Sequence, residues 1–315
     1  MRIRIYDART DIQPKSGYGL MSYQIKANLK QLGHEILEFP DDKSGEDVVL
    51  WIRPPHYLAY PEFDPNKKNV IFTMHESETF EGWKSNWPEL LNKADAVITP
   101  TDWNKKVFEG NGVFKPIQVV PLGVNSKDYH GAKTYTFSVM TLHDALGRDG
   151  CRENWKDTIK AYFDAFSGDK RFEALLTIKS YNIDREGYGK YLDFLGRDDR
   201  PPIDIIDIDL INTELNNLYS KHWLFVKNAN REGWSLPLLE AMSVDLPVAF
   251  TDIPVLDWAK EYRGGQSFPL GDVVALKNIM TEGHKNWKKK KGFINSLSWK
   301  QCTKQVENVL KSVVV

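Results

Sequence analysis

Short apolar runs alternate with amphipathic stretches of helical length along nearly the whole chain. The runs cover residues 48–52, 70–74, 96–99 and 118–120 in the first half, and 136–141, 174–178, 203–208, 224–226 and 248–250 in the second half. Strands of a parallel sheet are buried on both faces, so their sequences are short and continuously apolar between crossover helices. The alternation predicts an α/β fold in which helices cover both faces of parallel sheets.

A polar, glycine-containing segment interrupts this alternation near residues 125–133. A chain of 315 residues that is 41% hydrophobic can give each half its own core, so we predict two doubly wound domains, 1–131 and 132–297. A final amphipathic helix over 298–315 is expected to pack back on the first domain. Ligands of open parallel sheets bind beyond the carboxyl ends of the strands, so we expect the active site in a cleft between the two domains.

Charge and cysteine content argue against several classes of protein. The 42 Lys and Arg residues balance 43 Asp and Glu residues, so net charge gives no general attraction to nucleic acid or anionic membranes. Cys151 and Cys302 are far apart, which argues against a disulfide framework and a cysteine-rich metal site. No run reaches the roughly 18 apolar residues of a spanning helix, so we expect a cytoplasmic protein without a transmembrane segment.

The segment 230–242 has the pattern of a helix N-terminus that binds anions. It follows an apolar run, bends at Gly233, and begins a helix with Ser235 as the expected cap and a proline in the first turn. Free backbone N–H groups and the helix dipole favour phosphate at such a place. Glu232 and Glu240 flank this turn, and carboxylates accept hydrogen bonds from sugar hydroxyls.

This segment resembles the Glu, seven residues, Glu motif of retaining glycosyltransferases with the GT-B fold, those of family four in particular. Residues 241–252 and 271–276 are similar to later parts of that family's donor domain, and 97–104 with 119–125 are similar to the end of its acceptor domain. The chain resembles a compact, phage-like member. The resemblance implies two Rossmann-like domains facing a central cleft, with the acceptor bound by the first and the nucleotide sugar by the second.

The resemblance also implies the chemistry. A hexosyl- or pentosyltransferase of this kind moves a sugar from a nucleoside diphosphate, most often UDP, to a hydroxyl acceptor with retention of configuration, and it requires no cofactor or metal ion. The implied catalytic residues are Glu232 at the sugar, Arg152 at the leaving diphosphate and His75 facing the acceptor. Glu240 is implied at the ribose. The other implied donor-binding positions are Gly17, Gly19, Gly233, Trp234, Ser235 and Leu236.

The sequence departs from the family pattern where a second cation is expected. Typical members have Arg-Lys-Gly-Trp before the first helix of the donor domain, whereas here Arg152 is followed by Glu153. Charge develops on the diphosphate as the glycosidic bond breaks, and fixed cations stabilise it. Arg148 and Lys179 are the candidate replacements, and surface salt bridges are the alternative interpretation of both.

Two patterns are similar to metal motifs. The His75-Glu76 pair lacks the second histidine of a zinc protease, because Thr79 stands at the required position. Asp207 and Asp209 have the Asp-x-Asp spacing of the other main glycosyltransferase fold, but they end a late apolar run, where alternating strand-edge acids are the expected interpretation. We therefore expect no metal site.

The acceptor is left open by the sequence. The first domain interleaves aromatic and basic side chains that can stack bases and pair phosphates, namely Trp83, Lys84, Trp103, Lys105 and Lys106. A hydroxymethylated base in DNA is therefore one candidate acceptor, beside a glycan, a lipid-linked sugar or a small molecule. Packed tryptophans with solvated lysines are the alternative interpretation of this cluster. A nucleotide-sugar-binding protein without transfer activity is the alternative to an enzyme.

Overall fold

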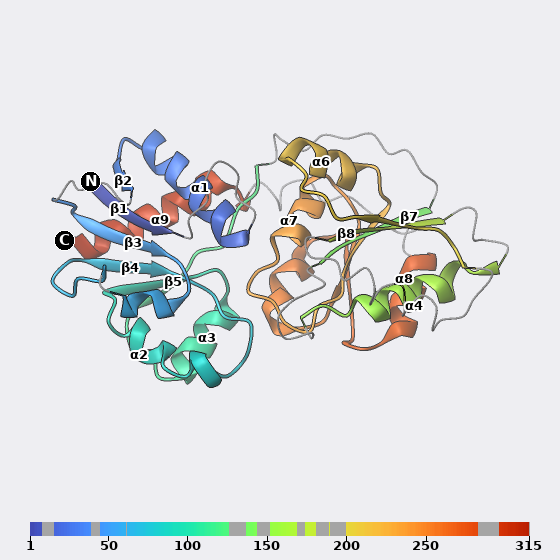
Figure 1. Ribbon diagram of the computed structural model, residues 1–315, viewed down its shortest axis with the longest axis horizontal. Coiled ribbons are helices and arrows are strands. Elements are labelled where there is room, and N and C mark those ends of the chain that lie inside the picture. The colour runs from blue at the N-terminus through green and yellow to red at the C-terminus, as the bar shows by residue number, and fades with distance from the viewer. Residues whose placement is uncertain are drawn as a thin grey trace. The chain divides into compact units, whose positions relative to one another are not determined.

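The structure, a computed structural model, describes residues 1–7, 16–38, 45–60, 62–125, 137–143, 152–168, 174–180, 189, 200–282 and 296–314. The chain divides into two compact units, Met1–Gly123 with Ser296–Val315, and Val124–Asn295 (Figure 1). The ends predicted from the sequence, after 131 and 297, lie near these divisions. Each unit is built on one parallel sheet, as the α/β prediction requires.

The first unit has a six-stranded sheet in the order β2-β1-β3-β4-β5-β6. Its strands are β1 (Arg2–Asp7), β2 (Glu35–Glu38), β3 (Val48–Ile52), β4 (Asn69–Phe72), β5 (Ala96–Thr99) and β6 (Ile117–Val119). Every residue of β3, β4 and β5 is buried, because helices cover both faces of the sheet at its centre. The strands predicted at 48–52 and 96–99 are confirmed residue for residue.

Helices enclose this sheet from both sides. Helices α1 (Gly17–Gln31) and α9 (Trp299–Val314) cover one face, and α2 (Trp87–Leu91) and α3 (Asp102–Gly110) cover the other (Figure 1). Two short 3-10 helices, η1 (Pro55–Ala59) and η2 (Gly82–Lys84), lie in the connections.

Gly17 and Gly19, two of the positions that the resemblance implies at the donor, lie in a helix and not in a loop. Both belong to the first turn of α1, and Gly19 is buried. The helix starts here because the Ser16 hydroxyl oxygen accepts a hydrogen bond from the Gly19 N–H at 3.1 Å, which satisfies one of the unpaired donors of the first turn.

Helix α9 packs against α1, β3 and β5, so the C-terminal segment belongs to the first unit. Trp299, Val306 and Leu310 are buried on its inner face. At its start, a Cβ added to Gly123 would lie 2.2 Å from the Trp299 backbone nitrogen, so only glycine permits this close approach.

The second unit has a six-stranded parallel sheet in the order β12-β11-β10-β7-β8-β9. Its strands are β7 (Phe137–His143), β8 (Ala174–Ser180), β9 (Ile203–Ile206), β10 (Leu224–Lys227), β11 (Val248–Thr251) and β12 (Gly265–Phe268). Its helices are α4 (Trp155–Phe166), α6 (Asn212–Ser220), α7 (Leu236–Ser243), the 3-10 helix η5 (Pro254–Glu261), and α8 (Val273–Glu282).

The core of the second unit fills the space between α4, α8 and the sheet. Tyr162 and Phe166 of α4 pack there with Leu176, Val226 and Phe268 from three strands. Helices α6 and α7 contact each other, and α7 packs on β10 and β11. None of the described helices is both long and apolar enough to cross a membrane.

Candidate functional site

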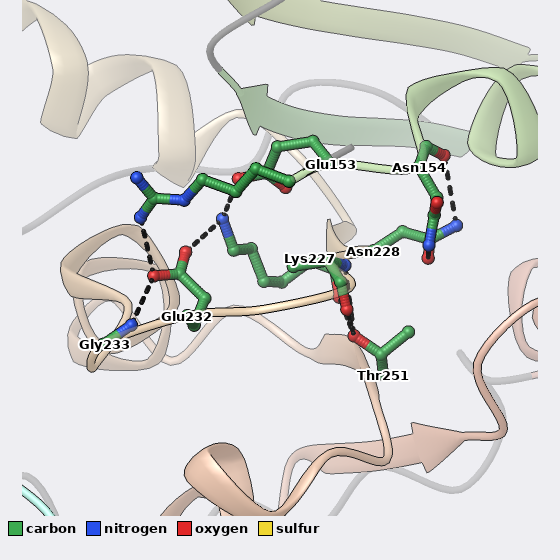
Figure 2. Close-up of polar contacts among 9 residues, drawn as sticks. Glu153, Asn154, Lys227, Asn228, Glu232, Gly233 and Thr251 are labelled. Carbon is green, nitrogen blue, oxygen red and sulfur yellow. Dashed lines mark hydrogen bonds and ion pairs between the residues drawn. The ribbon is translucent and has the colours of Figure 1, made fainter. Parts of the chain in front are cut away.

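A short antiparallel pairing fixes the segment before α4 against the segment that follows β10. The Asn154 N–H donates to the Asn228 carbonyl at 2.8 Å, the Asn230 N–H donates to the Arg152 carbonyl at 2.8 Å, and Glu153 forms the bridge opposite Ala229. The Asn154 amide also donates to the Asn230 side chain at 2.8 Å. Because these bonds fix both backbones, they hold the Glu153 side chain beside Lys227 at the carboxyl end of β10 (Figure 2).

Four charged side chains then alternate in sign, and we call them the charge network: Glu153, Lys227, Glu232 and Arg152. The Lys227 ammonium contacts Glu153 and lies 2.6 Å from Glu232 Oε1, and Arg152 Nη2 donates to Glu232 Oε2 at 2.8 Å (Figure 2). The Lys227 and Glu232 side chains are 3% exposed, and Arg152 is 39% exposed. Arg152 is therefore the member of the network that solvent or a ligand can reach.

The network fixes the charge of its members near neutral pH. Burial alone would raise the pKa of Glu232, but the charges and hydrogen bonds of Arg152 and Lys227 outweigh it and hold this pKa at about 2. Burial would lower the pKa of Lys227, and the adjacent Glu153 and Glu232 raise it instead. For Glu153, burial outweighs the attraction of Lys227 and raises the pKa. Glu232 is consequently a carboxylate and Lys227 an ammonium.

The two oxygens of Glu232 differ in their remaining capacity for hydrogen bonds. Oε2 accepts from Arg152 and, at 3.3 Å, from the Gly233 N–H, whereas Oε1 accepts from Lys227 alone within the described residues. A carboxylate oxygen has two lone pairs, so Oε1 retains one position for a further donor such as a sugar hydroxyl.

Helix α7 begins shortly after Glu232. We predict that the Ser235 side chain caps this helix, but the structure shows no capping hydrogen bond from it. Ser235 has left-handed backbone angles, φ 73 and ψ 76, whereas a capping serine is normally extended. Its hydroxyl and the Trp234 indole N–H are buried and have no hydrogen-bond partner among the described residues. Trp234 instead stacks on Trp258 of η5, with ring centroids 4.3 Å apart. The first backbone N–H groups of α7 lack partners within the helix and favour an anion there.

Glu240 lies in α7 and is buried in a different environment from that of Glu232. Its Oε2 accepts a hydrogen bond from the Tyr219 hydroxyl of α6 at 3.1 Å. Burial raises the pKa of Glu240 to about 7, against the lowering effect of this bond. Glu240 is therefore partly protonated near neutral pH, while Glu232 is ionised.

No family model and no curated protein matches this sequence. Among solved structures, HepE of Anabaena in complex with UDP and glucose matches 99% of this chain and 100% of its own, at 14% identity and a TM-score of 0.73. Sucrose-phosphate synthase of Thermosynechococcus elongatus matches 99% of this chain and 98% of its own, at 12% identity and a TM-score of 0.78. The chain has the GT-B fold.

A third structure extends this finding. An α,α-trehalose-phosphate synthase of Burkholderia vietnamiensis matches 97% of this chain and 78% of its own, at 12% identity and a TM-score of 0.65. In the GT-B fold of this chain the charge network and α7 belong to the second Rossmann-like unit. The predicted fold class is thereby confirmed.

Besides Arg152, the described cation that contacts Glu232 is Lys227, a residue that we do not nominate in place of a lysine at 153. Lys179 lies in β8 and is buried. Its ammonium donates to the Ser180 carbonyl at 3.0 Å, and burial lowers its pKa. Arg148 lies outside the described residues. Lys227 takes the position beside Glu232, and the sequence signal for it is a lysine that ends the apolar strand β10 shortly before Glu232.

In the first unit, His75 follows β4 and its ring is packed into the interior. The side chain stacks on Phe80 with ring centroids 4.3 Å apart, and its Nε2 lies 2.9 Å from the Thr79 carbonyl. The His75 backbone N–H donates to the Asn104 side chain at 2.6 Å. These contacts fix the ring, and His75 is 2% exposed.

The predicted cluster of aromatic and basic side chains is only partly a surface. Trp103 packs against the core, and Lys84 lies over the buried Trp87 ring, 5.6 Å from its centroid. Lys105 pairs with Glu109 of the same helix at 3.9 Å, and Lys106 is exposed. The Trp83 side chain lies outside the described residues. The buried Trp87 and the partly buried Trp103 agree with packed tryptophans at these two positions.

Asp207 and Asp209 follow β9, and their charges act on Lys179. Among the described residues, no three His, Cys, Asp or Glu side chains come together in a way that would hold a metal ion.

Proposed function

We propose that this protein is a glycosyltransferase that moves a sugar from a nucleoside diphosphate donor, UDP in the first instance, to a hydroxyl acceptor with retention of configuration. The observation that carries the proposal is Glu232, a buried carboxylate ionised by Lys227 and Arg152 at the start of helix α7. The fit of the chain to UDP-bound HepE over its full length supports it.

The donor would be divided among three sets of groups. Glu232 Oε1, with its one remaining acceptor position, would bind a hydroxyl of the transferred sugar. Backbone N–H groups of residues 233–236 would bind the diphosphate at the positive end of the α7 dipole. Glu240, held by Tyr219, would bind the ribose.

Charge on the leaving diphosphate would be stabilised mainly by Arg152. The charge network contains two cations and two carboxyl groups, so it has no net positive charge before the donor binds if both carboxyl groups are ionised. Lys227 offsets the buried carboxylates and holds Glu232 in place, which leaves the half-exposed Arg152 to face the phosphate. Fixed cations of this kind act strongly because they need no reorganisation as the bond breaks.

The transfer step itself would need no protein nucleophile. As the bond between the anomeric carbon and the diphosphate oxygen breaks, an oxocarbenium-like centre forms and the acceptor hydroxyl attacks from the same face. A phosphate oxygen of the leaving group takes the acceptor proton, so the nucleoside diphosphate leaves with it. For His75 we propose a packing role in place of the predicted catalytic one, and its buried ring, stacked on Phe80 and bonded to the Thr79 carbonyl, supports this.

Release of the nucleoside diphosphate from the donor tests this proposal. We expect the purified protein to release UDP or GDP from at least one member of a panel of UDP- and GDP-sugars, faster when a suitable acceptor is present. Tight donor binding without release or transfer over a broad acceptor panel would contradict it.

That contradicting outcome defines the second candidate, a nucleotide-sugar-binding protein without transfer activity. One observation favours it: with Glu153 in place of a lysine, the network has no net positive charge to offer a leaving diphosphate. Binding measured by calorimetry, together with the release assay, separates the two functions.

For the acceptor we propose a small hydroxyl compound or a glycan. A DNA base would need exposed aromatic side chains for stacking, whereas in the predicted cluster Trp103 is partly buried against the core and the Trp87 ring beneath Lys84 is buried. A shift of modified duplex DNA on a gel at low salt would contradict this choice.

A further inference from the structure

The order of strands in the first unit places a topological switch point between β1 and β3. From β1 the chain continues to β2 on one side, and from β3 onward it builds the sheet on the other side, β4, β5 and β6. The connections therefore diverge between β1 and β3. In open parallel sheets, ligands bind beyond the carboxyl ends of the strands at this switch point. The carboxyl ends of β1 and β3 are aligned, because Asp7 pairs with Ile52.

Arg53 is the first residue after β3 and therefore lies at this switch point. Its guanidinium lies over the Tyr57 ring, 4.6 Å from the centroid. Its Nε is buried without a hydrogen-bond acceptor, and the side chain has no ion pair within the described residues. Burying an arginine donor without a partner is unfavourable and uncommon, so the group calls for a physical reason.

The neighbouring acid, Asp7, is not a partner that would explain the buried Arg53. The Asp7 carboxylate, at the end of β1, is engaged by Lys26 at 2.8 Å and by the Ser22 hydroxyl. Its charge is offset by Lys26, so Arg53 adds a positive charge at the switch point that none of these groups balances. Stacking on Tyr57 uses the face of the guanidinium and leaves its N–H edge for an anion, which a phosphate or carboxylate can bind with two hydrogen bonds.

Aromatic rings continue from Arg53 in a row. The His56 ring packs on Tyr57 with centroids 4.3 Å apart, and Tyr57 packs on Tyr60 at 5.3 Å. Tyr60 is 50% exposed. A half-exposed tyrosine presents an apolar face with a polar end, a surface suited to a sugar ring.

From this arrangement we propose that Arg53 is the anion-binding residue of an acceptor site in the first unit, and that the acceptor is a sugar bearing a phosphate or a carboxylate. The Tyr57 ring orients the guanidinium, and Tyr60 contacts the sugar. That the bound sugar is the acceptor rests on the proposed glycosyltransferase function, whereas the binding of an anionic sugar at Arg53 is independent of that function.

Binding to the full chain, without donor, tests the inference. Glucose 6-phosphate and glucuronic acid are titrated by calorimetry beside neutral glucose, so the two anionic arms distinguish phosphate from carboxylate. At least one anionic sugar should bind about tenfold or more tightly than glucose, and binding should weaken as salt rises. The Nε–H signal of Arg53 in NMR spectra should move with the same titration. Equal binding of all three sugars, or none, would overturn the proposal.

Variants separate recognition from folding. Arg53→Gln should lose the preference for the anionic sugar, and Arg53→Lys should keep part of it because a lysine supplies charge without the two-pronged geometry. The matched control is Arg2→Gln, an exposed arginine at the opposite, amino end of β1. Arg53→Gln should melt at or above the wild-type temperature, since it removes a buried unsatisfied donor. An anionic preference that survives in Arg53→Gln would contradict the assignment.

The outcomes also separate this inference from the proposed function. If the wild-type chain releases a nucleoside diphosphate from a donor but prefers no anionic sugar, this inference fails alone. If an anionic sugar binds through Arg53 and no donor is bound or cleaved, the glycosyltransferase proposal fails alone.

Discussion

Lys227 Nζ lies 2.6 Å from Glu232 Oε1, and both side chains are almost fully buried. The lysine comes from the end of β10 and the glutamate from the loop before α7, so one strand and its following loop supply both members of the pair. The far side of Lys227 contacts Glu153, which arrives from the segment before α4. The ionised state of Glu232 thus depends on contacts between two separate segments of the chain.

Removing the buried ammonium should damage both stability and the proposed activity. Lys227→Met leaves Glu232 and Glu153 buried with Arg152 as the remaining cation of the charge network, and we expect a loss of about 3 kcal/mol or more in the free energy of unfolding. The pKa of Glu232, about 2 in the wild type, should rise. The pH profile of donor release should then gain an acid limb between about pH 4 and pH 6, where the wild type has none. Unchanged stability and pH profile would contradict the role of Lys227.

Glu153→Lys should restore part of the stability that Lys227→Met removes. Lys227→Met combined with Glu153→Lys returns an ammonium to the network from position 153, whose carboxylate is close enough to Glu232 for its charge to act on it. We expect the double variant to be more stable than Lys227→Met alone and its acid limb to move back toward lower pH. A double-mutant cycle on the free energy of unfolding measures this coupling. Additive effects would show that the two positions do not act on the same carboxylate.

Glu240 should make stability fall as pH rises. Its pKa is about 7 in the folded protein against an ordinary value of 4.5, so the folded state keeps a proton that the unfolded state has lost. Stability from this group is complete below about pH 4.5 and is lost as pH rises through 7, by about 3 kcal/mol. Urea unfolding from pH 5 to pH 8 should show that slope in the wild type and not in Glu240→Gln.

Tyr219→Phe provides the matched comparison for Glu240. It removes a hydrogen bond that lowers the pKa of Glu240, so the loss of stability should move to higher pH. A slope that stays at the wild-type pH would mean that the bond does not act on this carboxyl group.

The left-handed backbone of Ser235 should have a measurable cost. Its φ of 73 is accessible to glycine without penalty, and a Cβ in this region costs about 1 kcal/mol. Ser235→Gly should therefore be about 1 kcal/mol more stable than Ser235→Ala, which removes the same buried hydroxyl but keeps the Cβ. Equal free energies of unfolding for the two variants would show that the backbone is not strained.

The sequence predicts the centre of each sheet better than its edges. The strands at 48–52 and 96–99 are buried on both faces, so their apolar runs mark them. Strands β2 and β12 escape the same reasoning, because they lie at sheet edges and their sequences, Glu-Ile-Leu-Glu and Gly-Gln-Ser-Phe, have no long apolar run. The other two edge strands, β6 and β9, do carry apolar runs and are predicted, so an edge strand is missed where its sequence is polar and only its pairing defines it.

For the candidate functional site, the sequence locates the local turn at the start of α7 but not the residues from distant segments that contact it. The carboxylates and glycine at the start of α7 are contiguous, so the pattern from Glu232 to Glu240 predicts them together. The role of Lys227 is not predicted from the sequence, because its burial depends on Glu153, 74 residues away in the sequence. The unusual Glu153 is itself the signal, since a carboxylate in place of a lysine at a buried position requires a cation from another segment.

The rate of nucleoside diphosphate release by Glu232→Gln tests the central claim most directly. Glutamine keeps the size of the side chain but removes the charge that Lys227 and Arg152 hold, and we expect turnover to fall about 100-fold or more on the donor that the wild type uses. The control, Glu261→Gln at an exposed position of η5, should keep wild-type turnover. Circular dichroism of both variants checks that the fold is kept. Turnover of a folded Glu232→Gln close to that of the control would contradict the account.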